Sequence, residues 1–102
     1  MTKTKLLIAL RNNKTKEVTA YEVLPGLYAH RSFVFGRGCW KLSHSSGLGV
    51  GCTSNTRKNL VSAAQYAQAE VPIDWTQSAS ALSQSRKGSD WCREFHHAEC
   101  RL

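Results

Sequence analysis

The sequence predicts an α+β fold in one domain: an antiparallel sheet of about five strands, followed by one longer and two short helices packed on one face. The chain has 102 residues, a length typical of one domain. Before Cys52, turn signals separate short strand-like segments, and residues 40–52 alternate with the period of two that indicates strands. After Cys52, the apolar residues recur with helical spacing. Strands followed by helices along the chain favour an α+β architecture with helices segregated to one face of the sheet.

Three strands are expected in the first third of the chain. Residues 5–10 leave neither face polar, so we expect a central strand covered on both sides, or at least one that lies well inside the sheet. Residues 16–23 and 27–35 are the second and third expected strands. Asn12-Asn13 and Pro25-Gly26 are turn signals between them, and the glycines on either side of Arg37 end the third strand.

Residues 40–52, WKLSHSSGLGVGC, predict a hairpin of two further strands. Ser45-Ser46-Gly47 has the length and chemistry of a three-residue loop, with Gly47 in the left-handed conformation. One face of the hairpin carries four apolar residues that we expect in the core: Trp40, Leu42, Leu48 and Val50. The other face carries Lys41, Ser43 and glycines, and is expected to be flat, polar and mildly basic. Glycine on a strand face indicates either that a helix or a neighbouring strand packs close to that backbone, which we favour, or that a flat partner lies there.

Three helices follow the hairpin. A helix is expected from about residue 55 to residue 70, ending before Pro72, and its small alanine side chains allow it to lie close to the sheet. Asp74 and Gln77 suggest a capping box for a second, short helix. Ser89 or Asp90 is the expected cap of the last helix. The residues expected to face the core from the last two helices are Trp75, Ala79, Leu82, Trp91, Phe95, Ala98 and Leu102.

The charge of the chain restricts its partners. The formal net charge is +7 and the isoelectric point is about 9.6, which favour nucleic acid, nucleoprotein, an anionic membrane or an acidic protein surface. No apolar run is long enough to span a bilayer, and residues 6–10 are too short for a secretory signal. We therefore expect a cytoplasmic protein with reduced thiols and no membrane partner.

Metal binding and catalysis are not expected. Cys92 and Cys100 lie about 12 Å apart along one helix, too far to share a tetrahedral metal. Only Cys92 or Cys100 with His96 is close enough, and the remaining ligands would have to come from Cys39, Cys52 or His44. No CxxC, GxSxG or P-loop motif is present. We predict no cofactor, no metal and no enzymatic activity, with His44 bonded to a backbone carbonyl.

Aromatic residues with basic neighbours indicate where a partner binds. Tyr28 lies near Arg31, Phe35 near Arg37, and Trp40 beside Lys41, a composition that stacks bases and holds phosphates but that also suits an ordinary sheet. Arg57 and Lys58 open the first helix after a run of small polar residues, where they either hold an anion or point into water. The predicted partner-binding residues are Arg31, Arg37, Lys41, Arg57 and Lys58.

One part of the chain resembles short accessory proteins of bacteriophages and mobile elements. His30-Arg31, then Trp40-x-Leu-Ser-His44-x-x-Gly47-Leu-x-Val50, and then an alanine-rich helix carry the resemblance, over residues 27–69. It implies binding to a host machine, and such proteins include anti-CRISPR proteins that block host defence. Many anti-CRISPR proteins are acidic and imitate DNA, whereas this chain is basic, so another mode is implied, such as gripping guide RNA or blocking an acidic surface.

Charge and resemblance together lead to one expected function and two alternatives. We expect a basic, non-enzymatic protein in the host cytoplasm that binds and inhibits a host defence nucleoprotein. The first alternative is an accessory or regulatory protein that binds DNA or RNA directly. The second alternative is a small zinc- or thiol-dependent protein.

Overall fold

The computed structural model describes residues 3–9, 14–34, 37–85 and 87–100, with the backbone alone at residues 9, 32–34, 37 and 51. Five strands come first: β1 (Lys3–Ala9), β2 (Thr15–Leu24), β3 (Leu27–Val34), β4 (Arg37–His44) and β5 (Gly49–Ser54). Three helices follow: α1 (Arg57–Glu70), α2 (Ala79–Ser85) and α3 (Gly88–Cys100). The strands form one antiparallel sheet in the order β1-β2-β3-β4-β5, so each strand pairs with its neighbour in sequence. The predicted α+β architecture is confirmed.

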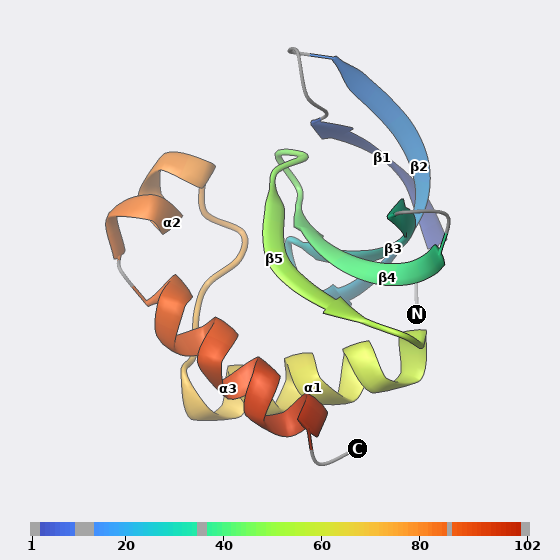
Figure 1. Ribbon diagram of the computed structural model, residues 1–102. Coiled ribbons are helices and arrows are strands. Elements are labelled where there is room, and N and C mark those ends of the chain that lie inside the picture. Colours follow the sequence, from blue (N-terminus) through green and yellow to red (C-terminus); the bar gives the residue numbers. More distant parts are fainter. Residues whose placement is uncertain (1–2, 10–13, 35–36, 86, 101–102) are drawn as a thin grey trace.

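The sheet is strongly curved, so that the β4–β5 hairpin at one edge approaches β1 at the other edge (Figure 1). The turn between β4 and β5 reaches β1, and a Cβ atom on Gly47 would lie 2.3 Å from the carbonyl oxygen of Leu7. Gly47 has a φ of 92°, which confirms the left-handed position predicted for the hairpin loop. This loop glycine therefore stands where the chain approaches itself closely, whereas the close approach was expected for glycines on the strand face. That expectation is wrong at Gly49 on β5, where a Cβ atom would meet nothing within 4 Å.

The first strand is an edge strand, which corrects the expectation of a strand covered on both sides. In the described part of the sheet, β1 pairs with β2 only. Leu6 is buried, but the side chain of Leu7 is 58% exposed. The meander order leaves the first strand at the edge, and the curvature of the sheet buries only one of its faces.

The main core lies between the sheet and the helices. In Figure 1, α1 and α3 lie together beneath the curved strands, and α1 contacts β3, β4 and β5. Alanines at positions 63, 64 and 67 of α1 are fully buried, which confirms that a slim helix lies against the sheet. Trp91 stands edge-on to Trp75 at 5.0 Å between ring centroids and stacks on Phe95 at 5.9 Å. Burial of Trp91, Phe95 and Ala98 confirms the predicted inner face of α3.

The hairpin faces differ in part from the prediction. Leu42 is buried and Trp40 and Val50 are half-buried, but Leu48 is 51% exposed and stands between the turn and the first residue of β5. Ser43, expected on an open polar face, is buried inside the curl of the sheet. The first strand of the hairpin was expected to begin at Trp40, but β4 begins earlier, at Arg37.

Both C-terminal helices begin at other residues than predicted. The carboxylate of Asp74 accepts the N–H of Thr76 at 3.0 Å, in a turn that precedes α2. The helix itself begins at Ala79, and the hydroxyl of Ser78 accepts the N–H of Ala81. The predicted capping box of Asp74 is therefore wrong. The last helix already includes Gly88, so Asp90 lies in its first turn, where a carboxylate suits the helix dipole.

Some expectations fall on residues outside the described ranges: the Asn12-Asn13 turn, the ends of the first and third predicted strands at residues 10 and 35, and Leu102. Across the described ranges, the helices are too short and too polar to cross a membrane.

A candidate nucleic-acid interface

Four side chains from four elements form a group that we call the basic aromatic cluster: Tyr21, Arg31, Trp40 and Arg57. The pairing register places the first three on one face of the sheet, because Arg31 lies opposite Trp40, and Tyr21 lies opposite Ala29, two residues before Arg31. This is the face on which α1 packs. Arg57, the first residue of α1, reaches the cluster from the helix side.

The rings and guanidinium groups of the cluster are in direct contact. The centroids of Tyr21 and Trp40 lie 6.1 Å apart, with the ring planes tilted by 55°. Arg57 places its guanidinium carbon 4.4 Å from the centroid of Tyr21 and 5.7 Å from that of Trp40. Arg31 places its own 5.9 Å from the Trp40 centroid. Both arginines therefore lie within cation–π distance of Trp40.

This arrangement explains one feature that the sequence left open and one that differs from the prediction. A cation in the first turn of a helix costs about 0.3–1 kcal/mol against the helix dipole. Each cation–π contact contributes a comparable amount, about 0.5–1 kcal/mol at an exposed site, and Arg57 makes two of them. Trp40 was expected in the core. It is half-buried instead: it packs against the margin of the core, and the guanidinium groups of Arg31 and Arg57 lie over its ring.

Arg57 carries a positive charge that no carboxylate of the described residues offsets by an ion pair. Within the described ranges, the ion pairs are Lys5–Glu17, at 3.9 Å, and Arg93–Asp90, so no carboxylate pairs with Arg57. Arg31 is exposed at the edge of the cluster. Lys3 lies opposite Tyr21 in the register of β1 and β2 and adds a further cation on the same face. The surface can therefore attract an anionic partner.

The other predicted binding residues are distributed differently. Lys58 is exposed next to Arg57 at the start of α1. Lys41 pairs with His30 and Thr53 and so lies on the opposite face of the sheet, away from Trp40. The side chain of Arg37 lies outside the described residues. The structure thus brings together Arg31 and Arg57, keeps Lys58 beside them, and separates Lys41 from them.

Tyr21 is a member of the cluster that the predicted binding residues did not include. In the sequence of the second expected strand, Val18 and Ala20 share one face and Tyr21 lies on the other. Its proximity to Trp40, however, depends on the register of three strands, which local patterns do not specify.

The start of α1 is capped by Thr56. Its hydroxyl accepts the N–H of Asn59 at 3.1 Å, which satisfies one of the free donors of the first turn. The cap was expected among residues 54–56, and the structure confirms this position.

Two buried histidines have structural partners. The Nε2 of His44 lies 2.9 Å and 2.8 Å from the carbonyl oxygens of Trp75 and Gln77, while its Nδ1 accepts the N–H of Ser46 at 3.2 Å. This confirms the expected bond to a backbone carbonyl and ties the hairpin to the segment before α2. The Nδ1 of His30 lies 3.0 Å from the carbonyl oxygen of Arg31, and its Nε2 lies 2.8 Å from the hydroxyl of Ser43.

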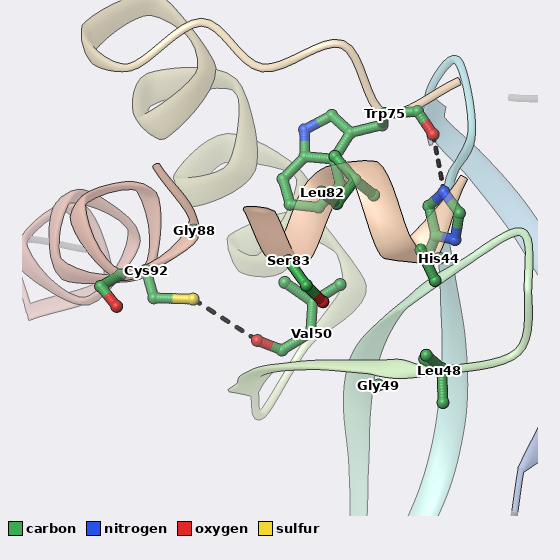
Figure 2. Close-up of a pocket in the computed structure, with 11 residues that line it drawn as sticks. His44, Leu48, Gly49, Val50, Trp75, Leu82, Ser83, Gly88 and Cys92 are labelled. Atoms are coloured by element: carbon green, nitrogen blue, oxygen red, sulfur yellow. Dashed lines mark hydrogen bonds between the residues drawn. The ribbon is translucent and has the colours of Figure 1, made fainter. Parts of the chain in front are cut away.

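A separate cavity of about 410 Å³ lies between β5, α2 and α3 (Figure 2). Its walls include His44 and Trp75 on one side and Cys92 on the other, with Val50 between them. None of the cluster residues lines it. Throughout the described part of the chain, no group of three His, Cys, Asp or Glu residues is placed to hold a metal ion.

The cysteine and histidine side chains of α3 do not face one common site. His96, His97 and Cys100 are exposed, whereas Cys92 is half-buried and faces Cys52.

No protein-family model, no curated protein and no solved structure matches this chain. The functional inference therefore depends on the residues of the basic aromatic cluster.

Proposed function

We propose that this protein is a non-enzymatic binding protein of a phage or mobile element that acts on a host defence nucleoprotein. In this proposal, the basic aromatic cluster holds a single-stranded part of the nucleic acid in that complex. The observation that carries the nucleic-acid contact is the packing of Arg31 and Arg57 against Trp40 and Tyr21 at a partly exposed surface. The phage origin and the host target come from the sequence resemblance alone.

The geometry suits a single strand for a chemical reason. Unpaired bases stack on aromatic rings and on the planes of arginine guanidinium groups, while arginine N–H groups bond phosphate oxygens. A guanidinium already held over a ring loses less conformational freedom when it binds phosphate than a solvated side chain does. Arg57 is held in this way by two rings, and Arg31 lies at the exposed rim of Trp40.

The same cluster favours a second candidate, direct binding of free nucleic acid. The two candidates differ in what is needed for binding. If purified single-stranded RNA or DNA binds as tightly as the assembled nucleoprotein does, the direct-binding candidate is correct. If tight binding needs the assembled complex, the inhibitor proposal is supported.

The test replaces the two arginines and measures affinity and salt dependence together. We expect Arg31→Gln with Arg57→Gln to weaken binding of labelled single-stranded RNA at least about tenfold, equivalent to roughly 1.4 kcal/mol. Each lost phosphate contact should also make the slope of log K against log salt less steep by about 0.7. Fluorescence anisotropy at several salt concentrations gives both values.

The matched control removes the same charge elsewhere. Lys16 and Lys87 are both exposed and lie outside the cluster, so Lys16→Gln with Lys87→Gln should lower affinity only slightly. Equal losses in the two double variants would show that net charge alone drives binding and would contradict the cluster. Circular dichroism should show the same helix content in every variant.

A further inference from the structure

Two thiols from distant parts of the sequence meet between the sheet and the last helix. Cys52 on β5 is fully buried, and Cys92 on α3 is half-buried. Their Sγ atoms lie 3.4 Å apart, although 40 positions separate the residues in the chain. A disulfide bond is about 2.05 Å long. The two sulfur atoms therefore need to approach each other by little more than an ångström to bond.

The cavity gives access to one of these thiols and not to the other. Cys92 belongs to its wall, together with Val50, Leu82 and Ser83, whereas Cys52 is not among the lining residues. Figure 2 shows the Cys92 sulfur directed toward the Val50 carbonyl oxygen at the cavity, 3.4 Å away. A small molecule in the cavity therefore meets Cys92 first, and Cys52 lies behind it.

The contact between the two sulfur atoms also makes them chemically unequal. Cys52 donates its S–H toward the Cys92 sulfur, and this hydrogen bond lowers the pKa of Cys92. The same contact, followed by burial, raises the pKa of Cys52. The thiolate is the nucleophilic form of cysteine, so the accessible residue is the more reactive of the pair.

We propose that Cys92 is a site of oxidation by hydroperoxides and that Cys52 converts the oxidised residue into an intramolecular disulfide between β5 and α3. The proposal concerns residues outside the basic aromatic cluster and does not depend on the function proposed for it.

The reaction proceeds in two balanced steps. The Cys92 sulfur attacks one oxygen of hydrogen peroxide, the O–O bond breaks, and the products are a Cys92 sulfenic acid and water. The Cys52 sulfur then attacks the Cys92 sulfur, the S–OH bond breaks, and the hydroxyl group leaves as a second water with the Cys52 proton. Overall, two thiols lose two electrons and two protons, and the peroxide is reduced to water. A small dithiol reverses the change by thiol–disulfide exchange.

The disulfide has a physical consequence for the fold. It joins residues 40 positions apart and so restricts the unfolded chain strongly. The midpoint of thermal unfolding should rise by more than about 5 °C in the oxidised protein.

The experiment treats the wild-type protein with a small excess of hydrogen peroxide and maps its peptides by mass spectrometry without reduction. We expect a monomer lighter by two hydrogen atoms, a peptide pair joining Cys52 to Cys92, and unmodified Cys39 and Cys100. Oxidation of Cys100 before Cys92, or a disulfide between any other pair, would overturn the proposal. Because this mapping uses the wild-type chain, it does not depend on how a variant folds.

Variants separate the roles of the two residues and of the cavity. In Cys52→Ser, we expect the Cys92 sulfenic acid to persist and to be trapped by a sulfenic-acid reagent. Cys100→Ser is the matched control and should form the Cys52–Cys92 disulfide at the wild-type rate. Ser83→Trp places a bulky ring at the cavity wall and should slow oxidation of Cys92 several-fold, with Cys100 unaffected. An unchanged rate at Cys92 in Ser83→Trp would show that the oxidant does not arrive through the cavity.

Discussion

At the scale of single residues, His30 shows how the curved sheet changes the chemistry of a side chain. It is 2% exposed, and both ring nitrogens have partners inside the curl of the sheet. A carbonyl oxygen only accepts, so Nδ1 carries the hydrogen toward Arg31, and Nε2 accepts the Ser43 hydroxyl. Burial lowers the pKa of His30, the Arg31 carbonyl partly offsets this, and the nearby charge of Lys41 lowers it further.

The lowered pKa of His30 predicts that acid destabilises the protein. Below the ordinary histidine pKa of about 6.5, the unfolded chain binds a proton that the folded state does not yet bind. The free energy of unfolding should therefore fall as the pH drops from about 6.5 toward the lower pKa of the folded state. Urea unfolding at pH 7.5 and pH 5.5 measures this difference.

The variant His30→Gln should lose part of that pH dependence, although it is less stable at both pH values. His97, exposed on α3, is the matched control, and His97→Gln should keep the wild-type dependence. A wild-type dependence in His30→Gln would contradict the assignment of the titration to His30.

At the scale of elements, one amide holds the C-terminal half of the chain onto α1. The Oε1 of Gln68 accepts the indole N–H groups of Trp75, at 3.0 Å, and of Trp91, at 3.1 Å. Its Nε2 donates to the carbonyl oxygen of Ile73 at 2.7 Å. Gln68 thereby joins α1, the segment before α2, and α3. Buried indole N–H groups need such a partner.

Removing this amide should destabilise the fold. Gln68→Met has nearly the same shape but leaves two buried donors without an acceptor, which we expect to cost about 2–4 kcal/mol of unfolding free energy. Gln65 is exposed on the same helix, so Gln65→Met should stay within about 0.5 kcal/mol of the wild type. Equal stabilities of the two variants in urea unfolding would show that Gln68 does not have this role.

At the scale of the whole molecule, the scaffold separates two chemically different regions. The basic aromatic cluster lies where β2, β3 and β4 pass the start of α1. The cavity with Cys92 lies between β5, α2 and α3, and it shares no residue with the cluster. Substitutions in one region should therefore leave the other intact.

The elements that the sequence predicted well depend on local signals. The loop at Gly47 and the helix from residue 57 to residue 70 follow from a turn residue, a capping residue and a change of period. The place of β1 at the sheet edge does not follow from its apolar residues, because it depends on pairing order and sheet curvature.

The candidate sites show the same division between local and non-local information. Arg31 and Arg57 were predicted as binding residues from charge. Their meeting around Trp40 depends on the register of β3 and β4 and on the packing of α1. Cys52 and Cys92 meet only through the packing of α3 on β5, so no spacing rule in the sequence identifies them as a pair.

Binding of nucleic acid at the basic aromatic cluster can be followed through the three tryptophan indole N–H signals in an NMR titration with single-stranded RNA. Trp75 and Trp91 are buried and bonded to Gln68, so they serve as internal controls, whereas Trp40 is half-buried within the cluster. We expect the Trp40 signal to shift with RNA concentration and the other two signals to remain in place. A Trp40 signal that stays fixed, while the side-chain signals of Lys41 and Thr53 on the opposite face move, would contradict binding at the cluster.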